Sequence, residues 1–208
     1  MSHKLISRIK SGAGLTNRAA VPHLTNIIAW EGRLEEAAQL LAQTLAAKPR
    51  KGKKPVLIHS LRVAYRLIAL GCCRDVVVAG LLHDLLEKAS QAMHRQVAQR
   101  FGLEVAHMVQ ATTNDPSIRE PLRRYADSVR RCSIYGEGAL LVRGADLLDN
   151  CERALALTGG VKLARLAGKL RILIAAGKEL QIDRKMLDQL QRCLRRVVRK
   201  ISLGPAHK

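Results

Sequence analysis

The chain has 208 residues, of which 48% are hydrophobic, 25% charged and only 2% aromatic, and 36 basic against 17 acidic residues give it a net charge of +19. This composition excludes a disordered chain. The five cysteines have no CxxC spacing, which argues against a disulfide framework or a zinc–thiolate site. No apolar run reaches the roughly 18 residues needed to span a bilayer. We therefore expect one cytoplasmic domain whose excess positive charge favours an anionic partner, whether a nucleotide, a nucleic acid or an acidic surface.

The first residues are expected to form a basic flexible segment, 1–24, because Gly12, Gly14 and Pro22 interrupt any regular element. The first thirty residues contain four Lys or Arg and no acid, which would also suit a targeting segment. A secretory signal is not supported, since a continuous apolar stretch is missing.

Apolar residues recur at helical spacing along the rest of the chain. The predicted helices lie at about 25–47, 55–70, 74–88, 92–101, 103–111, 122–133, 138–158, 161–177 and 183–200. Proline or glycine follows several of them, as at Pro49, Gly71 and Gly102, where helices commonly stop. No stretch alternates with a period of two. The sequence thus predicts an all-α, single-domain helical bundle, with a core at 25–160 and basic C-terminal helices within 161–208 packing on it.

Polar side chains interrupt the most apolar of these helices. His83 and Asp84 lie between two pairs of leucines, and burying them costs free energy unless they find partners. His59 on the preceding helix and Asp146 on a later apolar helix are of the same chemical type, and Asn150 shares the helix face of Asp146. A single histidine in a helix is usually structural. Together, His59, His83, Asp84 and Asp146 predict a site for one divalent ion, Mn²⁺, Fe²⁺ or Mg²⁺.

Five ordered motifs surround these residues. They are Arg50…Pro55…His59, the AGLLHDLLE run at 79–87, the FGLEVAHMV run at 101–109, Thr113-Asn114-Asp115, and the LVRGAD run at 141–146 followed by Asn150. The set resembles the HD phosphohydrolase superfamily. Over roughly 35–155 it is similar to the RelA/SpoT-type alarmone hydrolases, which remove the 3′-pyrophosphate of guanosine tetraphosphate.

The resemblance implies roles for particular residues. His59, His83, Asp84 and Asp146 would bind the metal, which is Mn²⁺ in that family. Glu87 would orient or deprotonate the attacking water, and Asn150 would assist in the catalytic pocket. Arg50 would contact the base, while Arg143 and Asn150 would line the nucleotide pocket.

Lys88 departs from the family pattern, in which the acid equivalent to Glu87 is followed by an aspartate. Lys88 could bind a substrate phosphate directly, or it could mark a degenerate site. The sequence therefore leaves two hypotheses: a nucleotide phosphohydrolase, and a non-catalytic HD protein that binds nucleotide or nucleic acid in a regulatory role. The basic segment 194–200 is either a solvated helix face or a surface for RNA or membrane.

Overall fold

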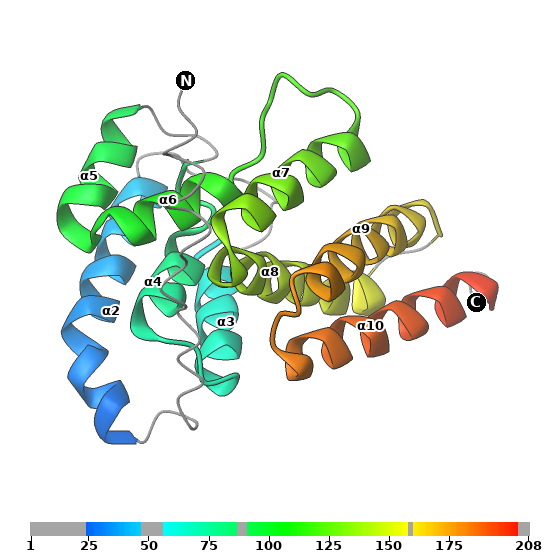
Figure 1. The fold of residues 1–208 in the computed structure, drawn as a ribbon, viewed down its shortest axis with the longest axis horizontal. Helices are drawn as coiled ribbons and strands as arrows, with labels where there is room; N and C mark the ends of the chain where they lie inside the picture. The colour runs from blue at the N-terminus through cyan, green and yellow to red at the C-terminus, as the bar shows by residue number, and fades with distance from the viewer. Residues whose placement is uncertain (1–23, 47–55, 87–90, 158–159, 204–208) are drawn as a thin grey trace.

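The computed structural model describes residues 24–46, 56–86, 91–157 and 160–203 (Figure 1). All but the last residue of the expected N-terminal segment lie outside this part of the chain. Arg50, Glu87 and Lys88 lie outside it as well.

The described residues form helices and connecting turns, without a strand. The helices are α2 (Leu24–Ala46), α3 (Val56–Ala69), α4 (Arg74–Leu82), α5 (Gln91–Phe101), α6 (Leu103–Thr112), α7 (Pro121–Tyr135), α8 (Glu137–Leu157), α9 (Gly160–Glu179) and α10 (Arg184–Ser202). The predicted all-α bundle is confirmed.

Helix α8 runs through the middle of the molecule and packs against α3, α4, α6, α7, α9 and α10 (Figure 1). Its residues from Ala139 to Asp149 are all buried. A helix that is apolar on all sides belongs inside a bundle, so the few polar residues of α8 must face partners on neighbouring helices. This central position brings α8 carboxylates within reach of α3 and α4.

Helices α3 and α4 approach each other closely at Gly80. A β-carbon at this position would overlap the Cδ1 atom of Leu67 on α3. The missing side chain leaves room for the Leu67 side chain, so that α3 and α4 can pack closely at this point.

Helix α4 ends at Leu82, so the predicted helix over 74–88 was too long and His83 and Asp84 lie in the turn that follows it. The turn is tighter than an α-helix, because the Leu85 N–H donates to the Leu82 carbonyl at 2.8 Å. The His83 Nδ1–H donates to the Gly80 carbonyl, with 2.8 Å between Nδ1 and the oxygen. This carbonyl is one of the acceptors that a helix end leaves without a backbone partner. The helix therefore ends directly before the polar pair His83-Asp84.

The C-terminal helices are attached to the same core. Helix α9 packs against α7, α8 and α10, and α10 packs against α8 and α9. The N-cap residue of α10, Asp183, accepts from the Met186 N–H at 3.0 Å, and its own N–H donates to Glu137 Oε1 at 2.8 Å. The start of α10 is thereby tied to the start of α8. Among the described helices, none is long and apolar enough to cross a membrane.

Candidate metal centre

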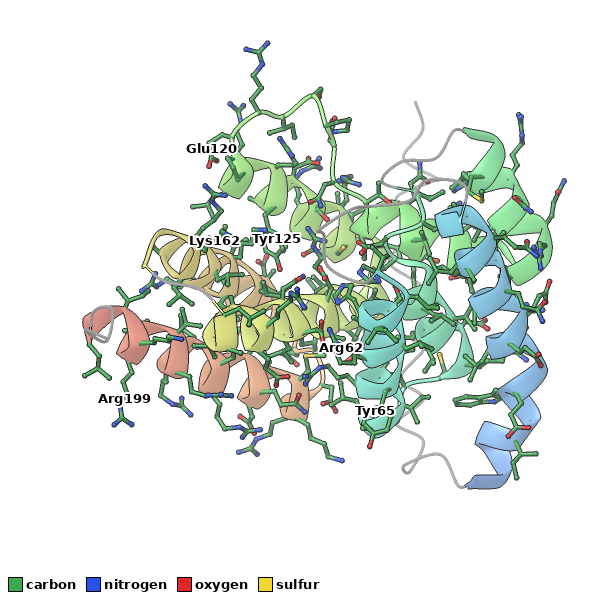
Figure 2. The ribbon with its side chains drawn as sticks, turned by 180° about the vertical axis from the view of Figure 1, so that it is seen from behind. Arg62, Tyr65, Glu120, Tyr125, Lys162 and Arg199 are labelled. Atoms are coloured by element: carbon green, nitrogen blue, oxygen red, sulfur yellow. The ribbon has the colours of Figure 1, made fainter. Side chains whose placement is uncertain are left out.

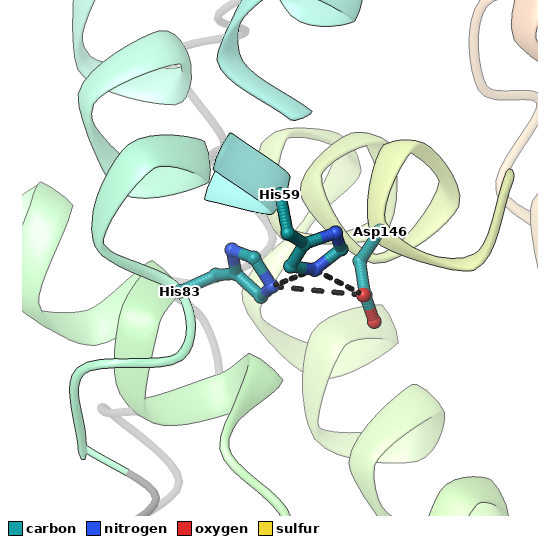
Figure 3. A group of neighbouring side chains, drawn as sticks. All are labelled: His59, His83 and Asp146. Carbon is teal, nitrogen blue, oxygen red and sulfur yellow. Dashed lines mark hydrogen bonds and ion pairs between the residues drawn. The ribbon is translucent and has the colours of Figure 1, made fainter. Parts of the chain in front are cut away.

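Two imidazoles and one carboxylate converge in the core (Figure 3). His59 comes from α3, His83 from the turn after α4, and Asp146 from α8. The His59 Nε2 atom lies 3.2 Å from His83 Nε2 and 3.2 Å from Asp146 Oδ1, and His83 Nε2 lies 3.6 Å from the same oxygen. Each residue therefore offers one donor atom toward a common point.

Asp84 lies beside this triad. Its Oδ1 is 3.3 Å from His83 Nε2 and its Oδ2 is 3.8 Å from His59 Nε2. Its side chain is 24% exposed, whereas the His59 side chain is fully buried. The structure thus brings together all four residues predicted to hold the metal, with Asp84 on the side that reaches solvent.

Asp149 is a residue of the centre that the sequence prediction missed. Its buried carboxylate accepts from the His59 Nδ1–H, with 2.6 Å between Nδ1 and Oδ2. Arg62 donates to it twice, from Nε at 2.5 Å and from Nη2 at 3.0 Å. Burial alone would raise the pKa of Asp149, but these hydrogen bonds from His59 and Arg62 hold it well below the usual range. The carboxylate holds the Nδ1 side of the His59 ring, so that Nε2 faces the triad.

His83 is oriented in the same way by a different acceptor. Its Nδ1–H donates to the Gly80 carbonyl, which leaves Nε2 directed at His59 and Asp146. Burial lowers the pKa of His83, but the nearby carboxylates of Asp84 and Asp146 outweigh burial and raise it to about 9. Burial would likewise raise the pKa of Asp146, yet hydrogen bonds with His59 and His83 hold it well below its ordinary value.

This donor set fits a divalent cation. Imidazole nitrogen together with carboxylate oxygen suits first-row metals such as manganese and iron. A buried carboxylate requires positive charge close by, and both histidines are held by hydrogen bonds from their second ring nitrogens, as metal-ligating histidines usually are. His59, His83 and Asp146 would hold the ion, with Asp84 beside them.

A cavity of about 390 Å³ opens next to the centre, between α7, α8 and α9. Its lining residues are Asp84, Asn114, Tyr125, Arg143, Asp146, Leu147, Asn150, Ala154, Lys162, Arg165, Leu166 and Lys169. The metal candidates Asp84 and Asp146 lie on its wall together with four cationic side chains. The cavity can therefore place an anionic group against a bound metal.

Arg143 and Asn150, both predicted to line the nucleotide pocket, contact Asp146 directly. Asn150 Nδ2 donates to Asp146 Oδ1 at 2.5 Å, and Arg143 Nη1 donates to Oδ2 at 3.3 Å. The Arg143 guanidinium also donates to Asn114 Oδ1 at 2.8 Å and lies 4.5 Å from the centre of the Tyr125 ring. These contacts fix the arginine where it can meet both metal ligand and substrate.

A second cavity, of about 730 Å³, lies on the other side of Asn114 and is lined mainly by α5, α7 and the loop after α6. It is larger, but none of the four metal candidates borders it. Catalysis at a metal requires the substrate to reach the metal, so the smaller cavity is the better candidate for the substrate.

Three cations of the smaller cavity were not foreseen from the sequence. Lys162, Arg165 and Lys169 come from α9, beyond the stretch that carries the family motifs. Their approach to Asp146 depends on how α9 packs between α7 and α10, which no local pattern in the sequence reveals.

Comparison with known proteins identifies the family to which this metal centre belongs. A family profile described as "HD domain" matches residues 37–155. A guanosine-3′,5′-bis(diphosphate) 3′-pyrophosphohydrolase of Aquifex aeolicus is 28% identical over 122 residues, which are 57% of this chain and 17% of that protein. A probable enzyme of the same name from Mycoplasma pneumoniae is 30% identical over 112 residues, 49% of this chain and 15% of that protein. The chain thus spans about a sixth of the length of these curated relatives.

Solved structures share the fold. A metazoan ortholog of SpoT, described as hydrolysing ppGpp, superimposes with a TM-score of 0.62 at 24% identity, covering 81% of this chain and 96% of that one. A Listeria monocytogenes EGD-e protein gives a TM-score of 0.56 at 24% identity, covering 70% and 98%. The profile match spans more than half of the chain and contains the whole metal centre, so this protein belongs to the HD domain family.

Proposed function

We propose that the protein is a metal-dependent phosphohydrolase that removes the 3′-pyrophosphate from guanosine tetraphosphate, with Mn²⁺ as its metal and Fe²⁺ or Mg²⁺ as alternatives. The observation that carries the proposal is the buried triad of His59, His83 and Asp146 beside a cavity lined by cations. The two curated relatives described above are named for this reaction.

Each part of the centre has a chemical task in this reaction. A divalent metal lowers the pKa of a bound water and polarises a phosphoryl oxygen. His59, His83, Asp84 and Asp146 would hold the metal, while Asp149 and Arg62 keep His59 in the required orientation. Asn150 fixes the Asp146 carboxylate through its amide, and we assign to Glu87 the task of accepting a proton from the attacking water.

The cations of the cavity suit a substrate with several phosphates. Arg143 is buried beside Asp146, and Lys162, Arg165 and Lys169 form the α9 wall opposite. Arg143 is buried and Lys169 half-buried, and such desolvated positive groups stabilise charge on a phosphoryl group more strongly than they would in water. Lys162 and Arg165, in contrast, are exposed. We place the phosphates along this wall, and we assign to Arg50 the contact with the base.

Lys88 favours a second candidate function, a nucleotide-binding HD protein without turnover. A lysine in place of the second catalytic acid could neutralise the general base or bind phosphate. The two functions differ in one measurement, because both predict nucleotide binding and only the first predicts release of pyrophosphate.

Purified full-length protein loaded with Mn²⁺ is incubated with guanosine tetraphosphate, and pyrophosphate is measured. The first function predicts release that is lost in Asp146→Asn and retained in Asp127→Asn, a carboxylate on α7 paired with Arg130 and Arg131. Binding without release by wild type, with release appearing in Lys88→Asp, would establish the second function. Neither binding nor release across a panel of nucleotides would reject both.

We also propose that the protein acts in the cytoplasm. All five cysteines are free in the structure, and four of them are buried. Unpaired thiols suit a reducing compartment.

A further inference from the structure

The outward face of α10 is a row of cations. Its exposed basic residues are Arg184, Lys185, Arg192, Arg195, Arg196 and Arg199. At 100° per residue, all six project within a sector of about 120°, and from the first to the last the row extends about 22 Å along the helix. We refer to these six residues as the α10 basic row.

The opposite face of the helix holds the row in place. Met186, Leu190, Cys193 and Val197 are buried against the core, and α10 packs along both α8 and α9. Figure 2 shows Arg199 near the C-terminal end of α10 with its side chain directed away from the body of the molecule. The cations are therefore displayed by a helix that is itself fixed.

One acidic side chain, Asp188, projects in the same sector of α10 and offsets only one of the six positive charges of the row. Across the part of α10 that the structure describes, no ion pair joins one of its cations to a carboxylate. Asp188 is the one acid of the helix itself, and residues 160–203 contain twelve Lys or Arg against three Asp or Glu. The row is also separate from the substrate cavity, whose α9 cations are Lys162, Arg165 and Lys169.

We propose that the α10 basic row docks on the phosphate backbone of a double-helical nucleic acid. A duplex carries one negative charge per about 1.7 Å of its axis, so a row of about 22 Å lies beside a dense array of phosphates. Arginine suits this role because its planar guanidinium binds phosphate oxygens in a bidentate manner. The inference does not depend on the proposed hydrolase activity.

Two other polyanions fit this surface less well. A membrane-bound amphipathic helix inserts its apolar face, but the apolar face of α10 is covered by the core, apart from Val198, Ile201 and Leu203 near its end. Single-stranded nucleic acid is held largely by stacking on aromatic side chains, and α10 contains none. A duplex requires only the cations.

The test is fluorescence anisotropy of a labelled 24-base-pair RNA duplex with the full-length protein, repeated over a range of salt concentrations. Arg192→Gln/Arg195→Gln/Arg199→Gln should reduce the slope of log affinity against log salt by about 2.7, at about 0.9 per lost phosphate contact, and weaken binding roughly 100-fold near 0.15 M salt. The matched control is Arg95→Gln/Arg119→Gln/Arg123→Gln, which removes the same charge from exposed positions on α5, on the loop after α6 and on α7.

The control should change the slope by less than about 1, since these arginines lie outside the row. A duplex DNA arm gives the same pattern if the backbone alone is recognised, and a preference for RNA or DNA also supports the proposal provided the α10 variant removes it. Equal losses in the two triple variants would overturn the proposal, as would binding confined to single strands or to phosphatidylserine vesicles. Glutamine preserves helix propensity, and unchanged melting temperatures confirm that the variants are folded.

Discussion

The Nδ1 atom of His59 and the Oδ2 atom of Asp149 lie 2.6 Å apart, across the interface of α3 and α8. Asp149 has no ligand atom in the triad, but its carboxylate holds the Nδ1 side of the His59 ring and so sets the direction of Nε2. The same carboxylate is paired with Arg62. The metal centre therefore extends one layer beyond its ligands, and this layer can be tested separately.

Asp149→Asn should weaken binding of Mn²⁺ by about 10- to 100-fold, as is usual when the partner of a metal-ligating histidine is altered. The amide oxygen still accepts a hydrogen bond, but the negative charge that makes His59 a stronger donor to the metal is lost. Competition titration with a metal-sensitive dye measures the affinity. Asp127→Asn, which also breaks a carboxylate–arginine contact but on α7, is the control and should bind the metal like wild type. Identical affinities in Asp149→Asn and wild type would contradict the role given to Asp149.

Removal of the metal should destabilise the fold. A cation that binds the native state and not the unfolded chain stabilises it by about 2.7 kcal/mol when its free concentration is 100 times Kd. We expect the melting temperature to fall when EDTA is added, to recover with Mn²⁺, and to be insensitive to both in Asp146→Asn. Differential scanning fluorimetry checks this. A wild-type protein whose melting temperature responds to no divalent ion would not have a metal centre here.

The helices could be predicted from the sequence because their apolar spacing and their Gly and Pro stops are local signals. The meeting of His59, His83 and Asp146 could also be predicted from the sequence, since buried polar residues in apolar helices require partners. The end of α4 was misplaced because the leucines after Asp84 continue the apolar pattern past the point where the backbone turns. Asp149 gave one usable signal, its position one helical turn after Asp146, but an acid on a helix is usually solvated. Its pairing with His59 depends on how α3 crosses α8.

Gly80→Ala should destabilise the protein by about 1–3 kcal/mol, the usual cost of overpacking. The added methyl group would overlap Leu67 Cδ1, and Val63 Cγ1 lies only 3.5 Å away. Urea unfolding followed by circular dichroism measures the change.

Gly32→Ala is the matched control for this substitution, because Gly32 also lies within a helix but has nothing within 4 Å of its added β-carbon. It should stabilise the protein by up to about 1 kcal/mol through helix propensity alone. Destabilisation by both substitutions to the same degree would show that the α3–α4 approach is not tight.

Two buried thiols should resist alkylation in the native protein. Burial raises the pKa of Cys72 to about 12 and that of Cys132 to about 11. The thiolate is the reactive form, so both should react slowly at pH 8, and the rate should rise as the pH approaches these raised values. Cys73, which is half-buried, should be labelled first. Mass spectrometry after iodoacetamide treatment gives the order, and rapid native labelling of Cys132 would show that the α7 core is open.

Lys169→Gln should raise KM for guanosine tetraphosphate by about tenfold or more, because a hydrogen bond to a charged group is lost. The value of kcat should change little, because the metal ligands are untouched. Lys169 is half-buried in the cavity wall and lies 5.0 Å from the centre of the Tyr125 ring. Lys178→Gln removes an exposed lysine from the same helix outside the cavity and should leave KM unchanged. An equal rise of KM in both variants would show that only the overall charge of α9 matters.

The same residue predicts a pH dependence. Burial and the neighbouring Arg143 lower the pKa of Lys169 below the ordinary lysine value of 10.5. As the pH rises through that lowered pKa, the ammonium group loses its proton and its attraction for phosphate, so KM of the wild type should increase at a pH where ordinary lysines are still charged. Lys169→Gln has no proton to lose at this position and should lack that increase, whereas Lys178→Gln should keep it. A wild-type KM that is flat over this range would mean that Lys169 does not contact the substrate.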